Sequence, residues 1–405
     1  MKLTDEEKRM LDGKHGQPVK MAMDILVAIG EIYGAEKLIP IKSAHIAGLS
    51  LKSHGIAGME WAEDIARSGA KVCVPTTLNV VGVDRSRELN LPAEWSTNQL
   101  RIEQAYECMG CYGTSTCVPY YMGFVPRFRE SIAWAESSAV VFTNSVLGAR
   151  DNREGGPTAM ASGLAGRTPL YGLHLDENRK GDVLYKITAD LRDIADFGGL
   201  GAYVGKRVGT KIPVFDGISH PAIEELVYLG AALASSGGVA MFHVSGVTPE
   251  APTAEAAFGD KKHETVLITN REIEEGKQQL TSARDSKVDY VALGCPHYSV
   301  RQLQEVVELL RGRRISKDVM MWVHTNVAIK GIAQQLGYVR AIEESGAIVT
   351  QDLCTVLGNP ESLGVKTLAT NSAKMAFYAP GSNGLGAWFG ETKRCIDAAV
   401  SGYWK

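Results

Sequence analysis

The stretch VDYVALGCPHYSVRQLQEVVELLR (residues 288–311) indicates the fold class of this chain. Its apolar run Val288–Leu293 has the length and composition of a buried strand, and Val300–Arg311 places apolar residues at helical spacing. A second apolar run, Val319–Val323, follows the helix. A strand, a helix and another strand in this order are typical of a parallel sheet covered by helices. The stretch therefore predicts an α/β unit.

The same alternation continues on both sides of this stretch. Further apolar runs predicted to be strands are Leu38–Ile41, Val72–Pro75, Val239–Val244 and Ala347–Thr350. Helical patterns lie between many of them, at Gly58–Ser68, Asn98–Met109, Ala222–Ser235, Arg271–Ala283 and Tyr338–Ser345. The glycine-rich segment Pro380–Gly390 is predicted to be a loop before a last helix near Glu391–Val400. We therefore expect an α/β protein with more than one sheet.

Length and composition are those of an ordinary globular protein. The chain has 405 residues, of which 45% are hydrophobic and 22% charged, and this excludes a disordered or coiled-coil protein. The formal net charge of -3 argues against a general nucleic-acid or membrane-surface binder. Met1–Gly13 is charged where a secretion signal would be apolar, and no apolar run is long enough to span a bilayer. We therefore expect a cytoplasmic protein.

Three of the seven cysteines have a similar setting in the sequence. Cys295 and Cys354 come directly after predicted strands, and Cys117 lies in a comparable loop before Pro119. Ligand-binding groups collect at such strand ends in open α/β sheets. Three thiolates cannot complete a structural zinc site, but they suit an iron–sulfur cluster with one iron open to substrate. Spacing alone favours the alternative that these are unrelated buried cysteines.

Cys108 and Cys111 form a single CxxC pair, which can be a redox or metal-binding motif. A structural role is favoured, because Cys108 belongs to a predicted helix and Cys111 follows Gly110 in a turn. The alternative is that Cys111 assists or replaces a ligand at the Cys117 site. Cys73 and Cys395 lie on strand and helix patterns and are predicted to pack in the core.

Polar segments supply candidate ligands for an anionic substrate. The loop Asn144–Pro157 contains Arg150, Asn152, Arg153 and Glu154, and arginine binds carboxylate or phosphate with two parallel hydrogen bonds. An ordinary solvated turn is the alternative for this loop.

Other segments could also bind an anionic substrate. Lys42–Gly55 and Pro75–Asn79 offer small residues that can cradle an anion through backbone N–H groups, and Lys374 can hold an anion as a point charge. The alternative, equally favoured, is that Lys374 is an ordinary surface lysine. Glycine-rich nucleotide-binding loops and the zinc-protease and serine-hydrolase motifs do not occur in the sequence.

Ten segments, taken in order along the whole chain, resemble the aconitase X family, and specifically its separate large subunit. They are Leu38–Ser43, Pro75–Asn79, Thr114–Tyr121, Glu136–Ala139, Asn144–Pro157, Gly172–Arg179, Thr248–Glu250, Gly294–His297, Asp352–Cys354 and Asn371–Lys374. No single segment is specific, so the resemblance rests on their number and order.

The resemblance implies several aconitase-like three-layer domains with largely parallel sheets around a central cleft. Residues 1–180 are expected to form an N-terminal α/β region with the polar loop and the first cysteine. Residues 181–405 are expected to form a C-terminal α/β region with two more cysteines. The small swivelling domain of the family is expected on a separate chain, which would form a heterodimer with this one.

The resemblance also implies a cofactor and a set of site residues. Cys117, Cys295 and Cys354 match the cysteines of an iron–sulfur cluster, expected to be of the 4Fe–4S type. The implied substrate ligands are Arg150, Asn152, Arg153, Glu154 and Lys374, supported by Thr77 and Asn79. The general base is expected to be a serine of the small subunit. Cys111 departs from the family pattern.

The implied activity is the dehydration of a small hydroxylated acid. We expect a hydro-lyase that converts (R)-mevalonate 5-phosphate to trans-anhydromevalonate 5-phosphate in the archaeal mevalonate route to isoprenoids, because the two-subunit form favours it. The alternatives are a subunit of a cis-3-hydroxy-L-proline dehydratase and a non-catalytic iron–sulfur protein. An NAD-linked oxidoreductase is disfavoured, because the glycine fingerprint of dinucleotide binding is missing.

Overall fold

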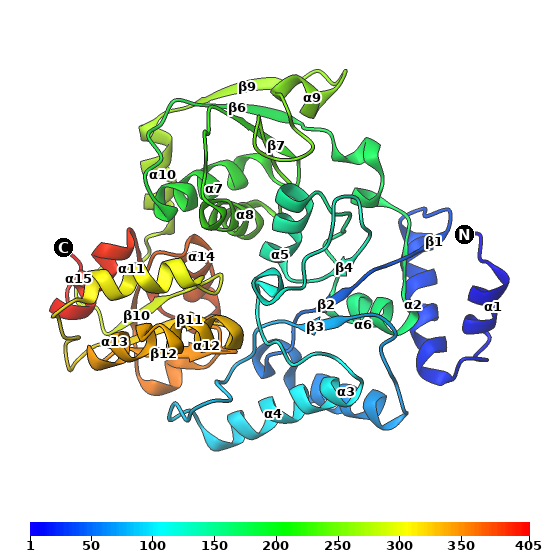
Figure 1. Cartoon of the computed structure of the whole chain (residues 1–405), viewed down its shortest axis with the longest axis horizontal. Helices are drawn as coiled ribbons and strands as arrows, with labels where there is room; N and C mark the ends of the chain where they lie inside the picture. The colour runs from blue at the N-terminus through cyan, green and yellow to red at the C-terminus, as the bar shows by residue number, and fades with distance from the viewer.

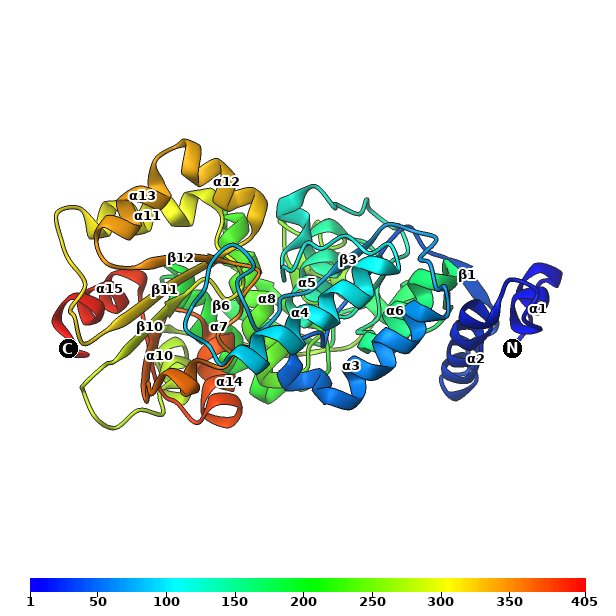
Figure 2. The same cartoon turned by 90° about the horizontal axis from the view of Figure 1, so that it is seen from below.

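The computed structural model describes residues 1–405, and they form α/β units with mainly parallel sheets. Figure 1 shows three bodies of structure that meet near the centre of the molecule, and Figure 2 shows that α1 and the C-terminus lie at opposite ends. No helix is both long enough and apolar enough to cross a membrane. The predicted fold class is confirmed.

The first body holds six helices and two small sheets. The helices are α1 (Asp5–Leu11), α2 (Gln17–Ile32), α3 (Leu51–Arg67), α4 (Ala93–Cys108), α5 (Ser137–Phe142) and α6 (Gly156–Ala165). One sheet pairs β1 (Leu38–Pro40) and β5 (Arg167–Pro169) antiparallel, and the other is parallel with the order β3 (Thr76–Leu78), β2 (Ala44–Ile46), β4 (Ala133–Trp134). Short helical turns follow at η1 (Pro119–Met122), η2 (Thr143–Leu147), η3 (Gly172–His174) and η4 (Asp176–Arg179).

The second body is a parallel four-stranded sheet with helices packed on it. The strand order is β8 (His243–Val244), β7 (Pro213–Asp216), β6 (Val183–Ile187), β9 (Glu264–Ile268). Its helices are α7 (Ile194–Val208), α8 (Ile223–Gly237), α9 (Ala254–Phe258) and α10 (Asn270–Leu280). Helices α7 and α8 approach so closely that a Cβ on Gly237 would lie 2.1 Å from the carbonyl oxygen of Gly205, so glycine is required there.

The third body is a parallel five-stranded sheet. The strand order is β12 (Ile348–Gln351), β11 (Met320–Thr325), β10 (Tyr290–Leu293), β13 (Thr367–Thr370), β14 (Gly386–Phe389). Its helical segments are α11 (Val300–Leu310), α12 (Val327–Gln335), α13 (Tyr338–Glu344), α14 (Ala373–Asn383), α15 (Thr392–Ser401) and the short turn η5 (Pro360–Leu363). The stretch 288–311 therefore forms β10 and α11, as predicted.

The largest hydrophobic core connects the first and third bodies. This cluster of 46 buried residues is centred on the five-stranded sheet and includes Val80, Cys117 and Trp134 of the first body. Separate clusters of 24 and 19 buried residues fill the first and second bodies. The division of the chain at residue 180 stays a prediction.

Two local predictions were wrong. Val72–Pro75 forms no strand, because the N–H groups of Val72 and Cys73 bond to the carbonyls of Met109 and Gly163 instead of a neighbouring strand. Pro380–Gly390 is not one loop, since α14 continues to Asn383 and β14 follows. Pro380 is tolerated because it lies near the end of α14, where its missing N–H removes a single helical hydrogen bond.

Candidate functional site

A cavity of about 330 Å³ lies where the first and third bodies meet. Its polar and sulfur-bearing lining residues are Ser53, Asn79, Cys117, Glu136, Ser137, Cys295, Cys354, Lys374, Tyr378 and Ser382. Apolar side chains and small residues complete the wall: Ala47, Gly48, Val80, Ala135, Val356 and Leu357. The structure thus brings the three predicted cluster cysteines to one cavity, although they are far apart in the sequence.

Strand ends position most of these groups. Cys295 follows β10, Cys354 follows β12 and Lys374 follows β13, so all three lie beyond the carboxyl edge of one parallel sheet. Cys117 comes from the first body, where the N–H of the preceding Thr116 donates to the carbonyl of Leu78 at the end of β3. Such an edge is where open α/β sheets place ligand-binding groups.

His297 connects the three cysteine-bearing segments. Its backbone N–H donates to Cys117 Sγ at 3.3 Å, and its Nε2 lies 3.0 Å from the carbonyl oxygen of Leu353, next to Cys354. Its Nδ1 lies 3.0 Å from Thr116 Oγ1. Complete burial lowers the pKa of His297 to about 4, so the ring is neutral near pH 7. Nε2 must then carry the proton, because a carbonyl oxygen can only accept, and Nδ1 accepts from Thr116.

The thiols differ in how readily they ionise. Cys295 and Cys354 interact with each other, and this contact lowers the pKa of one thiol of the pair while it raises that of the other, against the background of their burial. The pair therefore loses its first proton more readily than two isolated buried thiols would, and thiolate is the form that ligates metal.

The three cysteines fit an iron–sulfur cluster better than a single metal ion. No three His, Cys, Asp or Glu side chains converge closely enough to hold one ion. A cluster attaches each cysteine to a different iron, so its ligands stand farther apart than those of a single ion. Three sulfurs around one cavity, with an N–H donated to Cys117 Sγ, match this requirement.

A buried ion pair forms another part of the cavity wall. Lys374 Nζ contacts Glu136 Oε1 and lies 3.3 Å from Ser137 Oγ. Glu136 caps α5 and accepts hydrogen bonds of 2.7 Å from Ser138 Oγ and from the N–H of Ala139. These donors and the Lys374 ammonium lower the pKa of Glu136 despite its burial. The pair therefore holds a charged lysine beside the cysteines.

The other predicted substrate residues divide into two groups. Asn79 lines the cavity, and its Oδ1 has no hydrogen-bond partner. Thr77 does not line the cavity, and its hydroxyl lies 2.8 Å from His45 Nδ1. Arg150 and its neighbours do not line the cavity, since their side chains are bound elsewhere in the chain.

Each residue of the polar loop has its own partners. Arg150 bonds to Asp176 and to Glu250, and Arg153 donates to the carbonyl of Gly238. Asn152 bonds to Tyr171 and Leu173, and Glu154 to Thr168. A substrate role for Arg150, Asn152, Arg153 and Glu154 stays a prediction, and the geometry does not support it.

The remaining cysteines lie outside the cavity. Cys111 is buried in the hydrophobic core of the first body, as the structural reading predicts. Cys108 is exposed at the end of α4, and Cys395 is buried in α15. Cys73 is exposed, so the prediction that it packs in the core was wrong.

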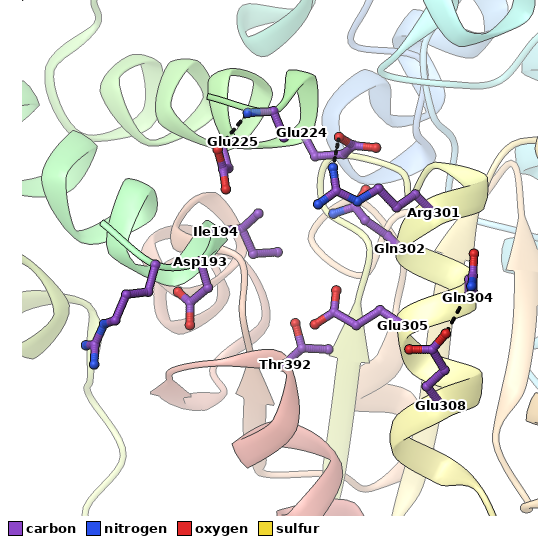
Figure 3. A pocket seen from close by; sticks show the side chains of 12 residues that line it. Asp193, Ile194, Glu224, Glu225, Arg301, Gln302, Gln304, Glu305, Glu308 and Thr392 are labelled. Atoms are coloured by element: carbon purple, nitrogen blue, oxygen red, sulfur yellow. Dashed lines mark hydrogen bonds and ion pairs between the residues drawn. The ribbon is translucent and has the colours of Figure 1, made fainter. Parts of the chain in front are cut away.

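A larger cavity of about 550 Å³ lies between α7, α8, α11 and α15. Its wall carries carboxylates, among them Asp193, Glu224 and Glu305, together with arginine and glutamine side chains, and Figure 3 shows the Arg301 guanidinium near Glu224. It contains no cysteine or lysine. Size alone therefore does not identify the candidate site, and the chemistry of the smaller cavity does.

The sequence analysis gave no site role to Glu136, Tyr378 and Ser382, which line the cavity, or to His297, which supports its cysteines. Glu136 follows β4 and precedes a helix, and this acidic cap at a strand end was the available signal. His297 follows Cys295 by two residues and ends the segment Gly294–His297 that resembles the family, and both were available signals. Tyr378 and Ser382 follow Lys374 at intervals of four residues, which places them on the same helix face.

Comparisons with known proteins agree with this geometry. Models of the first, second and third domains of aconitase X match residues 1–177, 181–278 and 288–401. The crystal structure of Thermococcus kodakaraensis aconitase X (holo-form) is similar with a TM-score of 0.91 and 40% identity, covering 98% of this chain and 100% of the other. This chain belongs to the aconitase X family.

The chain matches two kinds of named relatives, and the fraction of the relative's length that is matched differs between them. The phosphomevalonate dehydratase large subunit of Methanothermobacter thermautotrophicus is 43% identical over 96% of both chains. The cis-3-hydroxy-L-proline dehydratase of Pseudomonas aeruginosa is 38% identical, and the match covers 98% of this chain but 69% of that enzyme.

Proposed function

We propose that this chain is the large subunit of a phosphomevalonate dehydratase. The observation that carries the proposal is the cavity in which three cysteines meet a charged lysine and the side chain of Asn79. The match to a large subunit over nearly the full length of both chains supports this substrate over hydroxyproline. The reaction removes the 3-hydroxyl and a proton from C2 of (R)-mevalonate 5-phosphate, giving trans-anhydromevalonate 5-phosphate and water.

Cys117, Cys295 and Cys354 would hold the cofactor, which we propose to be a 4Fe–4S cluster. When bound, such a cluster with an open iron supplies Lewis-acid chemistry at the leaving hydroxyl. The chain's own residues hold the substrate in place. Lys374 binds the substrate carboxylate as a point charge, and Asn79 hydrogen-bonds to a substrate oxygen. We leave Arg150, Asn152, Arg153 and Glu154 out of this mechanism, because they do not line the cavity.

The general base is proposed to lie on a partner chain. Glu136 is the carboxylate in the cavity wall, but its oxygens already accept hydrogen bonds from Ser138, Ala139 and Lys374. A carboxylate stabilised in this way is a weak base. A serine of a small subunit is proposed to remove the C2 proton, in a heterodimer with this chain.

The test is an assay of the complex. The chain is produced anaerobically with its small partner, its iron and sulfide are measured, and mevalonate 5-phosphate and cis-3-hydroxy-L-proline are supplied separately. We expect dehydration of the first compound only. An iron-loaded complex that leaves mevalonate 5-phosphate unchanged would refute the proposal, and dehydration of hydroxyproline instead would assign the second activity.

A further inference from the structure

Three polar residues follow one another along the inner face of α14. Lys374, Tyr378 and Ser382 are spaced by four residues, and all three line the cysteine cavity. Side chains at this spacing lie one above another on a helix face. At a rise of about 1.5 Å per residue, the set extends roughly 12 Å along the helix axis. We call these residues the α14 stripe.

The two ends of the stripe differ in chemistry. Lys374 lies in the first turn of α14, beside Glu136, and the segment before it is fixed by Ser372, which bonds to the carbonyl of Cys295. Ser382 lies in the last turn, beside Asn383, which donates to Glu361 at 2.8 Å and to the carbonyl of Thr355, next to Cys354, at 3.3 Å. The Lys374 end, which we call the inner end, is therefore cationic, and the Ser382 end, which we call the outer end, offers neutral hydroxyl groups.

The outer hydroxyls are available to a ligand. Tyr378 and Ser382 line the cavity and are partly exposed, so their hydroxyls are not sealed in the protein core. Hydroxyl donors of this kind suit the oxygens of a phosphoryl group, since hydrogen bonds to a charged acceptor are stronger than those between neutral groups.

The wall near the stripe is apolar. Val80, Val356 and Leu357 line the same cavity, and such side chains suit an aliphatic chain. An extended five-carbon acid that carries phosphate at its far end has a length of the same order as the stripe. A compact ring without a phosphate would leave the outer hydroxyls unused.

We propose that the α14 stripe determines the substrate class by binding an anionic group at each end. Lys374 takes the carboxylate beside the cysteines, and Tyr378 and Ser382 together bind the distal phosphoryl group. This inference rests on the proposed function and deepens it, because it names the residues that select a phosphorylated acid over an unphosphorylated one.

The experiment uses the iron-loaded complex with Tyr378→Phe, Ser382→Ala and the double variant. Each single change is expected to raise KM for mevalonate 5-phosphate about tenfold, since each removes a hydrogen bond to a charged group. The kcat is expected to change less than twofold, because the phosphoryl group does not react and its binding is uniform through the reaction. Inhibition by (R)-mevalonate, which lacks the phosphate, is expected to be the same in every variant.

Controls separate this role from a loss of structure. Tyr403→Phe removes an exposed phenol outside the cavity and is expected to leave KM unchanged. Iron content and thermal unfolding are measured for every variant, and Ser382→Ala is the more conservative change should Tyr378→Phe fold poorly.

The outcomes are distinct. If active variants keep the wild-type KM for mevalonate 5-phosphate, the inference is overturned and the proposed function stands. The same conclusion follows if inhibition by (R)-mevalonate weakens as much as binding of mevalonate 5-phosphate does. A wild-type complex that is inactive on mevalonate 5-phosphate overturns the proposed function, and the inference with it.

Discussion

His297 belongs to the Cys295 segment and bonds to the segments of the other two cysteines. It is 2% exposed, and its contacts reach Cys117, Thr116 and Leu353. His297→Phe keeps a flat ring but removes both side-chain hydrogen bonds, so the cysteine segments lose their common support. We expect the affinity for iron to fall about tenfold or more, as is usual when a group that orients metal ligands is replaced. Iron and sulfide content after anaerobic reconstitution at graded iron concentrations measures the effect.

Two further variants give reference values for the iron content. Cys295→Ser removes a proposed ligand and sets the lower limit of iron content. Tyr403→Phe, outside the cavity, sets the upper limit. If His297→Phe takes up iron like the Tyr403 variant, the ring does not position the cysteines.

At the residue scale, sequence reasoning found the groups with a chemical signature and missed those defined by contacts. Cys295 and Cys354 stand out by residue type and by their place after predicted strands, whereas Cys117 and Lys374 were assigned to the site through the family resemblance. Glu136 does not stand out, because its partner Lys374 lies 238 residues away in the chain. Only the fold shows that the two share one cavity.

At the scale of the elements, the turn after β10 places Cys295. Gly294 has φ of +93°, and a Cβ there would lie 2.1 Å from the carbonyl oxygen of His324 on the neighbouring strand β11. Gly294→Ala combines backbone strain with this clash, so we expect it to destabilise the fold by roughly 3 kcal/mol and to displace Cys295. Chemical unfolding and iron content measure the two effects.

Gly312 is a matched control for Gly294. It has φ of +71°, but a Cβ added there meets no atom within 4 Å. Gly312→Ala carries only the backbone strain and is expected to cost about 1 kcal/mol without loss of iron. Equal effects of the two substitutions would show that the approach of β11 does not constrain the Cys295 turn.

Helices and strands with a strong hydrophobic periodicity were predictable from the sequence. Short strands that depend on hydrogen bonds to adjacent strands were not. The pattern of residues 288–311 is sufficient to place β10 and α11, because four consecutive buried residues and an amphipathic helix follow each other. Strand β4 is two residues long, so it carries no period that a sequence can reveal, and it exists because the adjacent strand β2 offers hydrogen bonds. The apolar run Val239–Val244 was predicted to be a strand, but only His243–Val244 pair in the sheet, as β8.

At the scale of the whole molecule, the polar loop joins the first body to the second. Arg179 is 1% exposed and pairs with Glu250, which also bonds to Arg150. The sequence predicted that Arg150 binds the carboxylate or phosphate of a substrate, but its partner in the structure is Glu250 of the chain itself, 100 residues away. An arginine that binds a substrate and one that binds its own protein look alike in a sequence, which is why this prediction lacks support from the structure.

Buried histidines make the whole fold sensitive to acid. Burial lowers the pKa of His45 and His174 to about 4 and that of His324 to about 3, from the ordinary value of 6.5. The guanidinium groups of Arg179 and Arg150 add to the shift at His174, and neither of its ring nitrogens has a hydrogen-bond partner. The folded protein therefore excludes protons that the unfolded chain binds.

The sign of the pH effect follows from these values. Above pH 6.5 neither state holds a proton on His174; between pH 6.5 and about 4 the unfolded chain binds one and the folded protein does not, so stability falls as pH falls. The loss from this residue approaches about 3 kcal/mol at pH 4. We expect His174→Phe to flatten the decline of the unfolding free energy of the metal-free chain between pH 7.5 and 5. His220→Asn, at an exposed left-handed position that Asn tolerates, should leave it unchanged. Identical pH slopes for wild type and His174→Phe would show that His174 is not held neutral.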